Sequence, residues 1–308
     1  MPPRTERDDG QPRRVGVEIE LGGLTVEQTA EAIRSTFGGQ VVIESTFCVN
    51  VRATIFGDFR VELDAALLRA EKYHKVLDSV GIDEESAAAR AFDELIEAAA
   101  GQVVPCEVVT SPLRFEQLPH LDDLREVLLA TGARGTKAAP WYAFGVHFNP
   151  ELVSPEPGSL MRYLQAFFLL EPKIRKEEHV DWSRRLTPYV DPFPDAYIER
   201  LLARSSVPTR PELVREYLEF NPSRNRSLDM LPAFMTLEPA IVAEFVDDPL
   251  IRARPTFHYR LANSRVDEPE WTLAEAWNRW VEVEVLAESP PGLRRRAERW
   301  LAEHRKDS

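Results

Sequence analysis

Acidic side chains stand at alternate positions of the segment RVGVEIEL, residues 14–21. Neighbouring residues of a β-strand point to opposite faces, so Glu18 and Glu20 would share one face, about 6.6 Å apart. That spacing lets two carboxylates reach one metal cluster or two neighbouring cations. The solvated face of an ordinary half-buried strand would show the same alternation, so this motif alone leaves both interpretations open.

Four further segments place polar side chains on one face of a predicted strand, namely residues 59–64, 103–110, 141–149 and 256–262. Carboxylate oxygens with an occasional imidazole suit Mg²⁺ or Mn²⁺, and an acid on a strand is unfavourable unless something positive is bound. The pattern therefore predicts a metal-centred site. If all five strands lie in one sheet, a single face collects Glu18, Glu20, Glu62, Asp64, Glu107, His147, Asn149, His258 and Arg260.

The elements that would position these strands carry clear helix start signals. Thr25, Thr209 and Thr272 each stand three residues before Gln or Glu, which is the spacing of a capping box. Strands and helices alternate irregularly, and neighbouring strands resemble hairpins, so we predict an α+β fold with a mainly antiparallel sheet. Further helices are predicted over residues 84–100, 158–170 and 193–204.

The composition limits the class of protein. The chain has 308 residues, of which 44% are hydrophobic, and its formal net charge is −13. A chain of this length and apolar content can bury a full core, which excludes general disorder. The acid excess argues against a nucleic-acid partner, whose binding surface would be basic. No apolar run approaches the roughly 18 residues that span a bilayer, so no membrane partner is expected.

The chain divides into one large predicted domain and two short ends. Residues 1–12 are charged and rich in Pro, Arg and Asp, which is typical of a mobile tail. No repeat or long linker interrupts residues 13–286, and residues 287–308 follow a Pro-Pro break and predict a basic helix. Cys48 and Cys106 are too few for a disulfide framework, and the polar N-terminus lacks a signal core, so we expect a cytoplasmic protein.

Four motifs in a fixed order resemble those of the amidoligase family, which are relatives of glutamine synthetase and gamma-glutamylcysteine ligase. The motifs are RVGVEIEL, EVVTSPL, GVHFNPE and RPTFHYRL, and the likeness runs from about residue 13 to 265. The resemblance implies a glutamine synthetase-like catalytic fold, a curved and mainly antiparallel sheet with helices on its convex side. It also implies an ATP-dependent carboxylate–amine ligase that forms an amide through an acyl phosphate and uses Mg²⁺ or Mn²⁺.

The resemblance also assigns roles to individual residues. Metal ligands are implied at Glu18, Glu20, Glu62, Glu107, His147 and His258. Contacts to nucleotide or substrate are implied at Asn149, Arg224, Arg226 and Arg260. Catalytic roles are implied at Asp64, Glu107 and Arg260, of which the arginine would hold phosphate in the path of the transferred group.

Two departures from the family pattern bear on these roles. The family usually has Glu two residues before the late arginine, whereas this chain has His258. An imidazole can ligate a metal with less negative charge, so metal preference and full activity are open questions. Residues 70–101 form a predicted helical insertion relative to a tight hairpin, which would either reach over the site or contact a partner.

Other classes of function stay open beside the ligase. A metal-dependent hydrolase or a phosphotransferase could use the same acidic cluster. A non-catalytic relative could keep the sheet and bind a peptide or a partner protein. For the ligase, the partners would be a small-molecule or peptide carboxylate and an amine, whose identities no residue specifies. The oligomeric state is equally unspecified.

Overall fold

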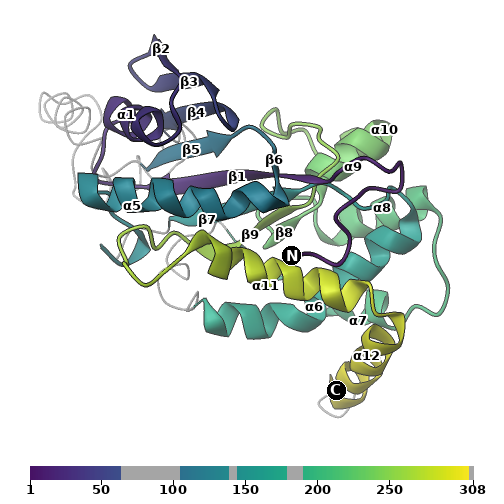
Figure 1. The fold of residues 1–308 in the computed structure, drawn as a ribbon. Helices are drawn as coiled ribbons and strands as arrows, with labels where there is room; N and C mark the ends of the chain where they lie inside the picture. Colours follow the sequence, from purple (N-terminus) through teal and green to yellow (C-terminus); the bar gives the residue numbers. More distant parts are fainter. Residues whose placement is uncertain (64–104, 139–143, 179–189, 305–308) are drawn as a thin grey trace, which may run out of the picture.

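The computed structural model describes residues 1–63, 105–138, 144–178 and 190–304. Within these ranges nine strands form one sheet in the order β2-β3-β4-β5-β1-β7-β9-β8, with β6 paired to β1 (Figure 1). Every pairing among these strands is antiparallel, which confirms the predicted α+β class. The strands are β1 (Arg14–Leu21), β2 (Gln40–Ser45), β3 (Cys48–Thr54), β4 (Gly57–Leu63), β5 (Cys106–Thr110), β6 (Leu113–Arg114), β7 (Gly145–Pro150), β8 (Leu228–Asp229) and β9 (His258–Asn263).

Strand β1 lies in the middle of the sheet because both of its edges are paired, to β5 on one side and to β7 on the other. One face of it is apolar and at most 1% exposed, formed by Val15, Val17, Ile19 and Leu21. Helices cover this face of the sheet (Figure 1). The ring of Trp277, on α11 (Leu273–Ala287), lies 5.4 Å from Phe148 of β7. The polar residues of the same strands therefore lie on the opposite face.

The helices begin where the sequence signals place them. Helix α1 (Val26–Phe37) has a complete capping box between Thr25 and Gln28, and α8 (Arg210–Phe220) has one between Thr209 and Glu212. The Thr272 side chain accepts a hydrogen bond from the backbone of Glu275 and so caps α11. The other helices are α5 (Leu121–Thr131), α6 (Pro157–Glu177), α7 (Asp195–Leu202), α9 (Leu231–Leu237), α10 (Pro239–Phe245) and α12 (Pro290–His304), with short 3-10 turns at η1 (Phe115–His120) and η2 (Thr136–Ala138).

Helix α6 is longer than the predicted range of residues 158–170. It continues through Pro172 to Glu177, although an interior proline normally ends a helix. Buried apolar side chains continue on both sides of this proline, at Leu170 and Ile174. Tertiary packing along the helix thus outweighs the local cost of the missing N–H.

The ends of the chain contact the body of the fold. The segment expected to be a tail is hydrogen-bonded to it, with the Asp8 amide donating to the Val153 carbonyl and the Arg13 amide to Thr5. Helix α12 begins at Pro290, so the Pro-Pro pair forms its first turn, where a proline's missing donor is not needed. The division into a tail, a domain and a C-terminal helix stays a prediction. Asp64, the whole predicted insertion of residues 70–101 and the helix predicted within it over residues 84–100 lie outside the described residues.

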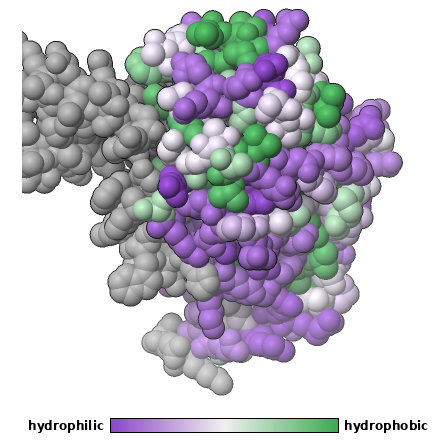
Figure 2. Space-filling view, turned by 60° about the vertical axis from the view of Figure 1, so that its left-hand side comes forward, coloured by the Kyte–Doolittle hydropathy of each residue, from purple (hydrophilic) through white to green (hydrophobic). Residues whose placement is uncertain are grey.

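The outer edge of the sheet exposes apolar side chains. Strand β2 lies at this edge, and Figure 2 shows apolar surface at the top of the molecule, where Figure 1 places the β2–β3 hairpin. Ile43 is 66% exposed, and Phe47, in the turn that follows, is 51% exposed. Among the described residues, every helix is too short or too polar to cross a membrane.

Candidate metal centre

The strand register brings the polar side chains of five strands into rows on the face opposite the helices. Glu20 of β1 lies directly beside Glu107 of β5, which in turn lies beside Glu62 of β4. One step along the strands, Glu18 lies beside His147 of β7. The predicted common face is therefore confirmed for these residues.

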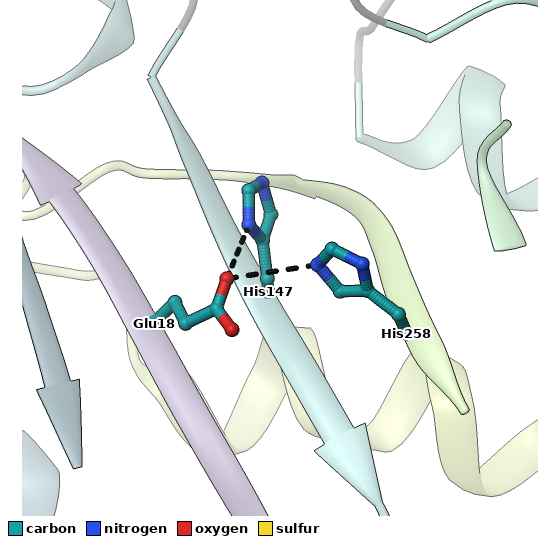
Figure 3. A group of neighbouring side chains, drawn as sticks. All are labelled: Glu18, His147 and His258. Atoms are coloured by element: carbon teal, nitrogen blue, oxygen red, sulfur yellow. Dashed lines mark hydrogen bonds and ion pairs between the residues drawn. The ribbon is translucent and has the colours of Figure 1, made fainter. Parts of the chain in front are cut away.

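Glu18 is the centre of this arrangement (Figure 3). Its Oε2 lies 3.0 Å from His147 Nδ1 and 3.6 Å from His258 Nε2. Its Oε1 accepts a hydrogen bond of 2.9 Å from Asn149 Nδ2 and lies 3.5 Å from Arg254 Nη2. The side chains of Glu18, His147 and His258 are 11%, 9% and 8% exposed, so this carboxylate meets the two imidazoles almost out of water.

Burial and these contacts set the protonation states of Glu18 and His147. Desolvation lowers the pKa of His147 to about 3, against the opposing effect of its hydrogen bond to Glu18. Burial alone would raise the pKa of Glu18, but its contacts with His147 and His258 outweigh burial and hold that pKa well below the usual range. At neutral pH the carboxylate is therefore ionised and the imidazole of His147 is neutral, the forms that bind metals.

A second set of ligand atoms adjoins the first. Glu20, Glu107 and His147 each offer an atom within 4.8 Å of the others, as do Glu18, His147 and His258. His147 Nε2 lies 3.8 Å from Glu20 Oε1, and the other oxygen of Glu20 accepts the Gly145 amide at 2.6 Å. The two sets share only His147, whose two ring nitrogens face different carboxylates.

Asp229, which the sequence patterns did not single out, lies beside His258 on the side away from Glu18. Nδ1 of His258 lies 3.5 Å from Oδ2 of Asp229, which is 2% exposed and ends strand β8. Its Nε2 is buried, points toward Glu18 and makes no hydrogen bond. The predicted ligand thus presents a nitrogen without a hydrogen-bond partner to the centre of the first set.

Of the predicted arginines, Arg260 acts on the ligand sets through its charge. It is on β9, is 9% exposed, and its charge lowers the pKa of His147 further. Its Nη1 donates to the Arg224 carbonyl at 2.7 Å, so the backbone of residue 224 helps to orient it. Arg226 instead donates to the carbonyls of Pro192 and Phe220 and packs over the Phe193 ring.

The structure does not assign Glu62 or Asp64 to either ligand set. Glu62 shares the face but forms a 2.7 Å ion pair with Arg60, and Asp64 lies outside the described residues. Sequence reasoning missed Arg254 and Asp229 as members of the site. Asp229 stands shortly after Arg224 and Arg226 in a segment without alternation, and Arg254, the first residue of the motif RPTFHYRL, lies in the loop before β9.

The donor atoms fit a divalent cation. Three candidate ligand atoms lie together in each set, with His147 common to both, and the buried nitrogen of His258, which makes no hydrogen bond, is the kind of group that a bound metal would satisfy. The oxygen-rich set suits Mg²⁺ or Mn²⁺, and the set with two imidazoles suits transition metals.

A comparison with protein-family models gives the class of protein to which these strands belong. The model described as "Putative amidoligase enzyme" matches residues 11–282. The chain belongs to this family. The amidoligase name describes an enzyme of the ligase type, and the match covers all of the strands that carry the site. Searches of curated proteins and of solved structures returned no match, so the glutamine synthetase-like form of the fold stays a prediction.

Proposed function

We propose that this amidoligase is an ATP-dependent carboxylate–amine ligase that uses divalent metals. The observation that carries the proposal is the convergence of two sets of metal-ligating atoms on one sheet face, with Arg260 beside them. The amidoligase family match supports the ligase class.

In the proposed reaction an oxygen of the substrate carboxylate bonds to the γ-phosphorus of ATP as the bond to ADP breaks. The nitrogen of the amine then bonds to the acyl carbon, inorganic phosphate leaves, and the ammonium proton passes to a base. Bound divalent metals would neutralise the triphosphate and the charge that moves with the phosphoryl group.

The residues of this chain have distinct tasks in that scheme. Glu20 and Glu107 would hold an oxygen-bound metal, with Glu62 next to them in the sheet. Arg260 would stabilise the moving phosphoryl group, because a fixed guanidinium is suited to a charge that develops in the transition state. Asn149 would orient nucleotide or substrate through its carbonyl oxygen, which is buried and makes no hydrogen bond.

The test begins with binding and ends with turnover. We expect Mg-ATP to raise the melting temperature of the full chain, since a ligand that binds only the folded state stabilises it. ADP release is then measured over a panel of amino acids and polyamines, each with and without a candidate carboxylate. Release that requires both substrates supports the ligase.

The rival functions give different results in the same assay. ADP release that needs no amine would indicate a hydrolase or a phosphotransferase instead. No binding of Mg-ATP would indicate a relative that keeps the sheet as a binding module, and would overturn the proposal.

A further inference from the structure

The two ligand sets differ in chemistry, although they share one imidazole. The first set, defined by Glu18, His147 and His258, offers one carboxylate and two imidazoles. We propose that this position is selective for a transition-metal ion of the Zn²⁺ type over Mg²⁺, that His258 determines the selectivity, and that Asp229 positions His258. The inference rests on the metal-dependent part of the proposed function and names the class of ion.

Two of the donor–donor distances in the set match a small tetrahedral ion. Donor atoms bound about 2.0–2.1 Å from a tetrahedral Zn²⁺ lie roughly 3.3 Å from one another. Glu18 Oε2 lies 3.0 Å from His147 Nδ1 and 3.6 Å from His258 Nε2, on either side of that value. All three ligand atoms lie within 4.8 Å of one another, so the set is compact enough for its side chains to close on one ion.

The donor atoms of the set disfavour Mg²⁺. Mg²⁺ is held by oxygen ligands and keeps several waters, whereas two of the three donors here are nitrogens. The only carboxylate has its Oε1 engaged by Asn149 and faced by Arg254, which leaves Oε2 for a metal. Two imidazoles with one carboxylate oxygen are a preferred donor set for Zn²⁺ and related ions.

Asp229 determines which nitrogen of His258 is available. A neutral imidazole has one N–H and one lone pair, and the N–H goes to the nearest acceptor. Asp229 Oδ2 lies 3.5 Å from Nδ1, and Glu18 Oε2 lies 3.6 Å from Nε2. A metal bound beside Glu18 would take the lone pair of Nε2 and leave the N–H on Nδ1, where Asp229 can accept it. A carboxylate behind a ligating histidine is the usual arrangement in metal sites.

His147 can serve only one of the two positions at a time, because a neutral imidazole has a single lone pair. With its Nδ1 on the first metal, its Nε2–H faces Glu20 Oε1, 3.8 Å away. The second position is then left with the carboxylates of Glu20 and Glu107, ligands that suit the Mg²⁺ of Mg-ATP. The chain would thus separate a transition-metal position from a magnesium position.

Titration calorimetry of the chelator-stripped full chain, without nucleotide, tests the selectivity. We expect one Zn²⁺ to bind about 100-fold or more tightly than Mg²⁺. His258→Glu should shrink that ratio at least ~10-fold, because a carboxylate replaces a nitrogen donor. The control is His120→Glu, at an exposed side chain, which should keep the ratio. A ratio that His258→Glu leaves unchanged would overturn the inference.

Asp229→Asn tests the positioning role. The variant keeps the side-chain oxygen that accepts the Leu231 amide, so the start of α9 is preserved. Its amide N–H would face Nδ1 and move the proton of His258 to Nε2, which is visible in the ¹⁵N shifts of the ring. We expect Zn²⁺ affinity to fall about 10–100-fold. A variant with an unchanged tautomer would contradict the positioning role, whatever its affinity.

The two proposals fail separately. Zn²⁺ selectivity that depends on His258, in a protein that binds no Mg-ATP, would support this inference and overturn the ligase. Amine-dependent ADP release with no preference of the protein for Zn²⁺ would do the reverse.

Discussion

Arg13 and Glu284 form a two-point ion pair in the interior of the protein, 271 positions apart in the sequence. Nη1 and Nη2 of the arginine each lie 2.8 Å from a carboxylate oxygen, and neither side chain is exposed. The Trp280 indole donates to the same carboxylate at 2.7 Å, and Arg13 also donates to the Glu151 carbonyl. The pair joins the start of β1 to α11, and so fixes the helical layer to the central strand.

Removal of the carboxylate from this pair should be strongly destabilising. Glu284→Ala leaves a buried guanidinium without its counter-charge, and we expect a loss of about 3–5 kcal/mol in the free energy of unfolding. Urea unfolding followed by circular dichroism measures it. Glu244→Ala, which breaks the exposed pair with Arg215, should leave the urea midpoint unchanged. If Glu284→Ala unfolds like the wild type, the pair does not hold the layers together.

Glu20→Gln and Arg260→Ala should each abolish amine-dependent ADP release. Loss of a fixed charge that acts in the transition state typically lowers turnover about 10²–10³-fold. Arg52→Ala removes a guanidinium that is 56% exposed on strand β3 and serves as the control. Near wild-type turnover by either site variant, with an unchanged circular dichroism spectrum, would contradict the roles assigned to these residues.

Cys106 should be inert to thiol reagents in the folded protein. Burial raises the pKa of its thiol to about 12, so almost no thiolate exists at pH 8. Burial also raises the pKa of Cys48. Ellman's reagent should therefore react slowly with the native chain and rapidly with both thiols in urea. Fast labelling of the native protein at pH 8 would show that these thiols are accessible in the folded state, which contradicts the prediction.

The same pKa shift predicts a loss of stability in alkali. The folded state favours the protonated Cys106 thiol, whereas the unfolded thiol ionises near its reference value of 9.0. The stabilising contribution is complete below pH 9 and declines as the pH rises toward about 12. Cys106→Ala should flatten this part of the pH profile of the unfolding free energy, while Cys48→Ala should flatten it less. Equal profiles for the wild type and Cys106→Ala would rule out the shift.

Helix α1 should depend on its capping box. Thr25→Ala removes the oxygen that accepts the Gln28 amide at 3.2 Å, and such a loss typically costs about 1 kcal/mol. Thr25→Ser keeps the oxygen and should melt within a degree or so of the wild type. Differential scanning calorimetry on the three proteins compares them, and equal melting temperatures for the Ala and Ser variants would show that the cap contributes nothing.

Local patterns were enough to predict the face on which the site lies. The alternation in residues 14–21 determines that Glu18 and Glu20 share a face, whatever strands pair with β1. The capping boxes likewise determine where α1 and α8 begin, because their hydrogen bonds are made within four residues. These features depend on neighbours in the sequence, which a single chain reveals directly.

The partners across the sheet were beyond such reasoning. Asp229 reaches His258 because β8, only two residues long, pairs with β9. A two-residue strand has no periodicity to detect, and Arg254 approaches Glu18 from a loop. The register between β7 and β9 shifts between Val146 and Phe148, so the alignment of their ligands depends on an irregularity that no local pattern encodes.

The central place of β1 has a consequence for how the protein acquires its structure. His147, the partner of Glu18, leaves the ribosome 129 residues after it, and His258 follows later still. One edge of β1 stays unpaired until β5 arrives and the other until β7 arrives, which favours slow folding and aggregation of the nascent chain. The candidate metal centre is assembled only when β9 has paired with β7. A bound ion would therefore report that these strands have come together, and could not guide the early steps of folding.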